Sequence, residues 1–68
     1  SHRVASNLLA ALGMTGAEDE AVAVRATLLG RKPGYSIAQA RDNYFFCADE
    51  DFLQRYAAGL RAAGVAET

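Results

Sequence analysis

The sequence predicts an all-α fold of two antiparallel helical hairpins, with about four helices in total. Fifteen of the 68 residues are Ala, only eight are β-branched, and apolar residues recur at helical spacing between turns that contain Gly or Pro. Ala loses no side-chain freedom in a helix, whereas β-branched side chains do. Because a chain of this length buries only about 60% of its unfolded surface, we expect one domain with a thin core.

The first predicted helix spans residues 3–13. We expect Gly13 to end or bend this helix, and Gly16 to lie in the turn after it. Its large apolar residues recur every four positions, which is the spacing of one helix face. These residues are Val4, Leu8 and Leu12, and Ala5 and Leu9 repeat the same spacing beside them.

The second predicted helix, residues 17–31, has signals at both ends. Thr15 precedes Glu18 by three positions, which is the spacing of a capping box. Acidic residues in the first turn and basic residues in the last turn suit the helix dipole. The stripe expected to be buried consists of Ala21, Val24, Leu28 and Leu29, with Val22 beside it.

A third, shorter helix is predicted after Pro33, because proline cannot continue the preceding helix. Ser36 and Gln39 repeat the capping-box spacing at its start. We expect this helix to run to residue 44 or 45, where an aromatic cluster of Tyr44, Phe45 and Phe46 should turn inward.

The fourth predicted helix covers residues 50–63. Asp49 has a side chain suited to capping its first turn. Gly64 should end it, with Val65 folding back against the helix. The stripe expected along it comprises Phe52, Tyr56, Leu60 and Ala63, with Leu53 and Ala57 beside it.

The stretch from Gly16 to Pro33 resembles the second helix of a tetratricopeptide repeat. Gly16 matches the turn between the two helices of the repeat, and Pro33 matches its end. Ala21 and Leu28 match two helix-contact positions. The resemblance implies that these residues belong to a helical hairpin.

The preceding helix matches the same repeat in part. Leu8 and Leu12 fall on its large apolar positions. Leu9 stands where the repeat usually has a small residue, and Ala5 stands where it has a bulky aromatic one. Arg25, in the second helix, also replaces an aromatic residue.

The second half of the chain is similar to the end of certain bacterial proteins that join a class III adenylate/guanylate cyclase domain to a tetratricopeptide array. Residues 33–36 match their Pro-Gly-aromatic-Ser/Thr turn. Residues 55–64 match the phrase Arg-Tyr-x-x-Gly-Leu-Arg-x-Ala-Gly in their closing helix. The resemblance covers residues 8–66, and implies a tetratricopeptide-like hairpin over 1–34 followed by a capping helix pair over 35–68.

The same resemblance implies a groove-facing surface on the first helix. Groove binders of terminal carboxylates use a basic residue and an Asn at the positions of Ser6 and Ala10, so such binding is not expected here. Aromatic residues, which anchor many interfaces, add three further candidates. The candidate interaction surface consists of Arg3, Ser6, Ala10, Tyr35, Tyr44 and Phe45.

No catalytic, cofactor-binding or metal-binding residue is predicted. His2 and Cys47 are the only residues of their kinds, so they cannot complete a zinc site. The acidic runs 18–20 and 49–51 suit helix N-termini, and the second run disfavours a thiolate at Cys47. A net charge of −1 gives no basic surface for nucleic acid, and no apolar run is long enough to cross a membrane.

We therefore expect a non-catalytic end cap of a helical-repeat array that mediates protein interaction or oligomerisation. Since the sequence begins without Met, we expect a longer, cytoplasmic parent protein. The resemblance implies that this parent is regulatory and carries adenylate or guanylate cyclase activity. The expected partner is a protein or a second copy, and no cofactor is expected. The alternative is a free-standing small helical protein that homodimerises or binds a partner protein.

Overall fold

The computed structural model describes residues 2–44 and 49–68. Within these two ranges no strand occurs, which confirms the predicted all-α fold. The predicted helix ends agree with the observed ones to within two residues. The helices are α1 (His2–Thr15), α2 (Glu18–Arg31), α3 (Ile37–Asn43) and α4 (Glu50–Ala62).

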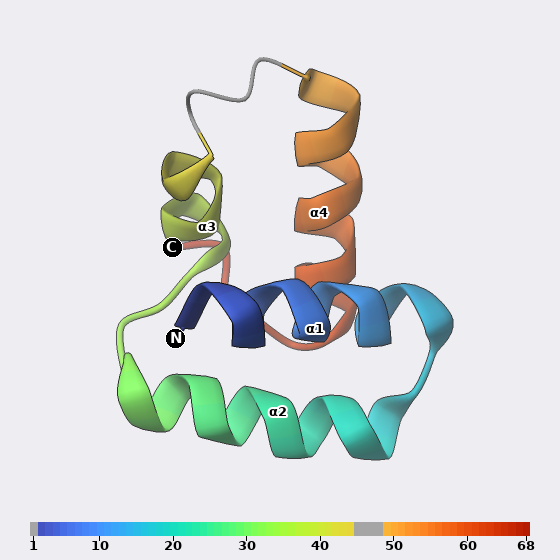
Figure 1. Cartoon of the computed structure of the whole chain (residues 1–68), viewed down its shortest axis with the longest axis vertical. Coiled ribbons are helices and arrows are strands. Elements are labelled where there is room, and N and C mark those ends of the chain that lie inside the picture. Colours follow the sequence, from blue (N-terminus) through green and yellow to red (C-terminus); the bar gives the residue numbers. More distant parts are fainter. Residues whose placement is uncertain (1, 45–48) are drawn as a thin grey trace.

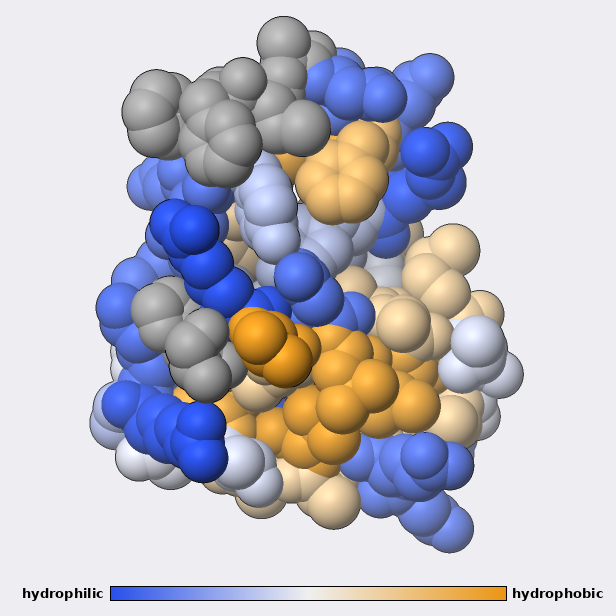
Figure 2. Space-filling model, viewed as in Figure 1, coloured by the Kyte–Doolittle hydropathy of each residue, from blue (hydrophilic) through white to orange (hydrophobic). Residues whose placement is uncertain are grey.

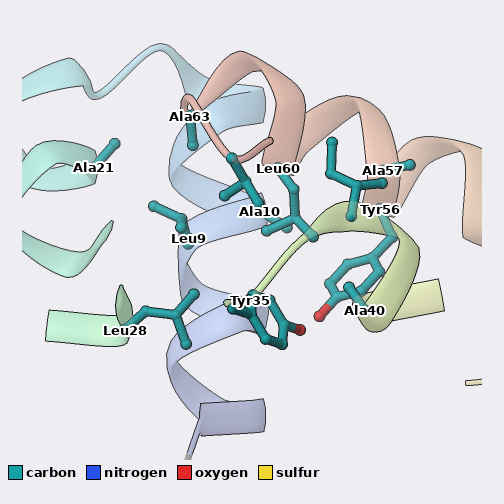
Figure 3. Close-up of a cluster of buried hydrophobic side chains, with 12 residues drawn as sticks. Leu9, Ala10, Ala21, Leu28, Tyr35, Ala40, Tyr56, Ala57, Leu60 and Ala63 are labelled. Carbon is teal, nitrogen blue, oxygen red and sulfur yellow. The ribbon is translucent and has the colours of Figure 1, made fainter. Parts of the chain in front are cut away.

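The four helices form two hairpins that cross each other (Figure 1). α1 and α2 run antiparallel, while α4 crosses α1 steeply and α3 lies beside α4. α1 therefore packs against both α2 and α4 and lies at the centre of the fold. Figure 3 shows most of the core, which consists of Leu9, Ala10, Ala21, Leu28, Tyr35, Ile37, Ala40, Tyr56, Ala57, Leu60, Ala63 and Val65.

Two glycines allow α1 and α4 to cross at close range. A Cβ atom on Gly59 would lie 2.4 Å from the carbonyl oxygen of Ala10. A Cβ atom on Gly13 would lie 1.9 Å from the carbonyl oxygen of Gly59. Both neighbouring atoms belong to the backbone, so no side-chain rotation could make room. The crossing therefore requires hydrogen at these two positions.

The caps expected for α3 and α4 are both present. The side chain of Ser36 accepts a hydrogen bond of 3.2 Å from the backbone N–H of Gln39. Asp49 accepts one of the same length from the backbone N–H of Phe52. Each cap satisfies an N–H group that has no partner within its helix.

The end of α4 also has the form that the sequence predicts. Gly64 has a φ of 91°, and its N–H donates to the carbonyl oxygen of Arg61 over 3.0 Å. The N–H of Val65 donates to the carbonyl oxygen of Leu60, also over 3.0 Å, and the Val65 side chain is buried. This pair of bonds with an apolar contact is the Schellman motif.

The connection between α1 and α2 differs from the prediction. Gly13 neither ends α1 nor introduces a break. A glycine is needed at this position because the backbone of α4 crosses there. The helix continues to Thr15, and Gly16 ends it with a φ of 74°. Thr15 therefore does not cap α2: its hydroxyl donates to the carbonyl oxygen of Leu12 in its own helix, over 3.1 Å. Ala17 occupies the N-cap position of α2 without a side-chain bond.

The buried stripe of α2 is narrower than predicted. Ala21 and Leu28 are buried, and Val24 and Leu29 are partly buried. Val22, which the sequence predicts beside this stripe, is 53% exposed, so it does not belong to the buried side. The reason is that α1 covers one side of α2, and Val22 lies about 100° around the helix from Ala21.

The last residues of the chain hold the start of α3. The N–H groups of Ile37 and Ala38 donate to the carbonyl oxygens of Ala66 and Glu67, over 2.8 and 3.0 Å. The side chain of Glu67 forms an exposed ion pair with Arg61. The tail therefore supplies two backbone partners that α3 cannot supply itself.

Deleting residues 66–68 should loosen α3 while leaving α1 and α2 folded. We expect amide exchange at Ile37 and Ala38 to become about tenfold faster, because each N–H loses its acceptor. Hydrogen exchange followed by NMR measures this effect. Glu67→Gln is the control, since it weakens the ion pair but keeps the carbonyl oxygen. Equal exchange rates in the deletion and the intact chain would contradict the assignment.

Candidate interaction site

One side of α1 carries large apolar side chains that the rest of the molecule leaves uncovered. Val4 is 68% exposed and Leu8 is 49% exposed. They lie one helical turn apart, while Leu12, a further turn along, packs in part against the core. Figure 2 shows apolar side chains gathered over α1 and toward α2. The apolar face predicted for this helix is therefore turned outward at its first two positions.

The contacts of α2 show which of its sides adjoins this surface. The guanidinium of Arg25 donates to the carbonyl oxygen of Ala63, at the end of α4, over 2.9 Å. Arg25 therefore marks the side of α2 that faces α4. The opposite side adjoins the uncovered apolar residues of α1, because α4 packs on the other side of that helix, at Ser6 and Ala10. Helical spacing puts Glu20, Val24, Thr27 and Arg31 on this side of α2, because each lies about 100–160° around the helix from Arg25. We call the surface formed by these four residues and by Val4 and Leu8 of α1 the outer face.

The structure separates the residues of the predicted interaction surface. Arg3 is exposed, but Ser6 and Ala10 are buried because α4 covers that side of α1. Tyr35 is also buried, and Tyr44 is partly buried. These positions are a correction to the predicted surface, since three of its members lie in the interior. Phe45 lies outside the described residues, as does Cys47.

Two of the buried candidates meet in a network of hydroxyl groups. Tyr35 donates a hydrogen bond of 2.8 Å to the hydroxyl of Ser6. The Ser6 hydroxyl also lies 2.5 Å from that of Tyr56, in α4. Figure 3 shows the two tyrosine hydroxyls turned toward each other. Ser6 therefore links α1 to α4 and to the segment before α3, which is a structural role inside the core.

An aromatic cluster extends this network toward the surface. The ring of Tyr44 meets those of Phe52 and Tyr56 edge to face, with centroid distances of 5.7 and 5.3 Å. The Phe52 and Tyr56 rings stack at 5.8 Å. The Tyr44 hydroxyl donates to the side-chain oxygen of Asn7 over 3.0 Å. The ring of Tyr44 therefore turns inward as expected, whereas Phe45 and Phe46, the rest of the predicted aromatic cluster, lie outside the described residues.

Removing the Tyr56 hydroxyl should change how stability depends on alkaline pH. Burial raises the pKa of Tyr56 above its ordinary value of about 10. Above that pH the unfolded chain releases the proton while the folded chain keeps it, so the free energy of unfolding falls as pH rises. We expect this fall to be shallower in Tyr56→Phe. Urea unfolding between pH 9 and about 11 measures it, and parallel curves would contradict the prediction.

A pocket of about 210 Å³ lies between the start of α2 and the end of α4. Arg25 and Glu18 both line it, and the Arg25 guanidinium donates to the carbonyl oxygen of Ala63, which also lines it. A Cβ atom on Gly64 would lie 2.0 Å from a guanidinium nitrogen of Arg25. Arg25, which departs from the tetratricopeptide pattern, therefore fixes the end of α4 by binding a carbonyl that the helix leaves unpaired.

The described residues hold no group of three or more His, Cys, Asp and Glu side chains that could bind a metal ion. None of the helices described is long and apolar enough to cross a membrane. Comparison with models of protein families, with curated proteins and with solved structures finds no match to this chain.

The outer face could be found only in part from the sequence. The four-residue recurrence of Val4, Leu8 and Leu12 indicates an apolar helix face. It does not indicate which face of α1 would receive α4. The side of α1 that packs against α4 depends on Gly13 and Gly59, which lie 46 positions apart. No short-range sequence pattern connects these two residues.

Proposed function

We propose that this chain is a non-catalytic helical module that binds a protein surface through its outer face. The observation that carries this proposal is the outward position of Val4 and Leu8. They share one exposed side of a helix that packs against both α2 and α4. Large apolar side chains that adjoin on one surface are typical of protein-binding sites, whereas singly scattered ones are not.

A finer proposal concerns the parent protein. The resemblance of residues 33–36 and 55–64 to the end of cyclase-linked tetratricopeptide arrays supports a role as the end cap of such an array. The parent would then be a cytoplasmic regulatory protein, such as an adenylate or guanylate cyclase. A neighbouring helical hairpin or a sister copy would cover the outer face. Ser6 and Ala10 lie under α4, so only Arg3 of the three groove positions is exposed, and the neighbouring hairpin would contact the outer face instead.

Site-directed photocross-linking tests the binding role. A photoreactive residue at position 8 should form a discrete protein cross-link in cells that make the chain at its natural length. The matched control is position 22, because Val22 is similarly exposed but lies on the side of α2 that faces α4. Mass spectrometry of the adduct identifies the segment that covers Leu8. No adduct at position 8, or equal adducts at both positions, would contradict the proposal.

The non-catalytic role is tested separately. The purified chain should produce no cyclic nucleotide and no diphosphate from nucleoside triphosphates and Mg²⁺. Turnover that survives repeated purification, and that a core substitution such as Leu60→Ala abolishes, would overturn this part of the proposal.

A further inference from the structure

We propose that the partner of the outer face is a second copy of this chain, bound about a two-fold axis. This inference rests on the proposed function, and it identifies the partner through the distribution of charge. Glu20 and Arg31 are both exposed, and they stand at opposite ends of the outer face with Val24 between them. They are eleven positions apart, about three helical turns or 16.5 Å, so they lie on the same side of α2.

A surface that is acidic at one end and basic at the other is complementary to itself when one copy is reversed. In an isologous dimer the same surface contributes from both subunits. A two-fold axis that lies in the interface, perpendicular to α1 and α2, places Glu20 of each copy opposite Arg31 of the other. Both ends of the interface then carry an ion pair.

The other in-plane axis, parallel to the helices, gives no such pairs. It would place Glu20 opposite the last turn of the second copy's α1, where no basic residue lies. The charges therefore select the reversed arrangement, in which each α1 meets the other antiparallel.

The apolar residues fit the same axis. Two residues connect α1 to α2. Counted from this connection, the midpoint between Glu20 and Arg31 falls between the eighth and ninth residues of α2. The same distance back along α1 leads to residues 7 and 8. Leu8 of each copy would therefore pack against Leu8 of the other near the axis, and Val4 would lie about one helical turn away from the axis. Because two large apolar residues per copy make a small interface, we expect a dissociation constant on the order of micromolar or weaker.

Sedimentation equilibrium of the 68-residue chain at low salt tests the dimer. We expect self-association that Leu8→Gln abolishes and that Val22→Gln leaves unchanged. Glu20→Arg and Arg31→Glu should each weaken association by about tenfold, because each makes the paired positions alike in charge. Added salt should reduce the difference between these variants and the unmodified chain.

Charge exchange provides the decisive result. An equimolar mixture of Glu20→Arg and Arg31→Glu should form a heterodimer, and the double variant should associate like the unmodified chain. These two arms also control for local effects of either substitution on α2. A chain that stays monomeric, or a mixture that fails to associate, would overturn the two-fold dimer. If the chain does not dimerise but position 8 cross-links to another protein, the proposed binding role stands and only the dimer is contradicted. If the chain neither dimerises nor cross-links at position 8, both proposals are contradicted.

Discussion

Gly59→Ala should destabilise the protein by about 3 kcal/mol, because the added methyl group has no space at the crossing of α1 and α4. The new Cβ atom would lie 2.4 Å from the carbonyl oxygen of Ala10, so the two helices must move apart. That movement loosens the packing of Leu9 and Leu60, which are both fully buried. For a domain of this size, the Tm should fall by roughly 10–20 °C.

Thermal unfolding followed by circular dichroism measures this change. Gly30→Ala is a matched control, since Gly30 also lies within a helix but nothing is within 4 Å of the position of its Cβ atom. Alanine favours helix over glycine, so this control should stabilise the chain by about 0.5–1 kcal/mol. Equal melting temperatures for the two variants would show that the helices do not cross at Gly59.

Ser6→Ala should have the second large effect, a loss of about 1–3 kcal/mol in the free energy of unfolding. The Ser6 hydroxyl accepts from Tyr35 and bonds to Tyr56, and its side chain is 0% exposed. Its removal takes away one hydrogen bond from each of two buried tyrosines, where water cannot replace it without disturbing the core.

Urea unfolding of single and double variants tests this network. Ser6→Ala and Tyr56→Phe together should cost less than the sum of their separate effects, because they share one bond. Thr27→Ala is the control: its exposed hydroxyl bonds only within α2, to the carbonyl oxygen of Ala23, and its loss should change stability by less than about 0.5 kcal/mol. Strict additivity of the first pair would argue against a shared bond.

The helix ends that local chemistry determines could be predicted well. Ser36 and Asp49 cap α3 and α4 as expected, and Gly64 ends α4. Each of these roles involves residues within five positions along the chain. The short-range spacing of side chains therefore contains the necessary information.

Features that depend on distant contacts could not be predicted. A glycine at position 13 is typical of a helix end, but in the structure Gly13 lies where α1 crosses α4, against the backbone of Gly59. The resemblance predicts an open surface at Ser6, yet its hydroxyl bonds to that of Tyr56, fifty positions away. The sequence pattern puts Val22 beside the buried stripe of α2, although α1 leaves that side of α2 uncovered. In each case the tertiary arrangement decides the environment, and no local pattern specifies it.

The anchoring of α3 by residues 66 and 67 has a consequence for the order in which the protein folds during synthesis. Translation proceeds from the N-terminus, so α1 and α2, which are adjacent in the chain, are complete long before those two carbonyls exist. We expect a nascent chain that ends before residue 66 to hold the first hairpin, with the start of α3 not yet anchored. The N–H groups of Ile37 and Ala38 gain their two acceptors only when residues 66 and 67 have left the ribosome.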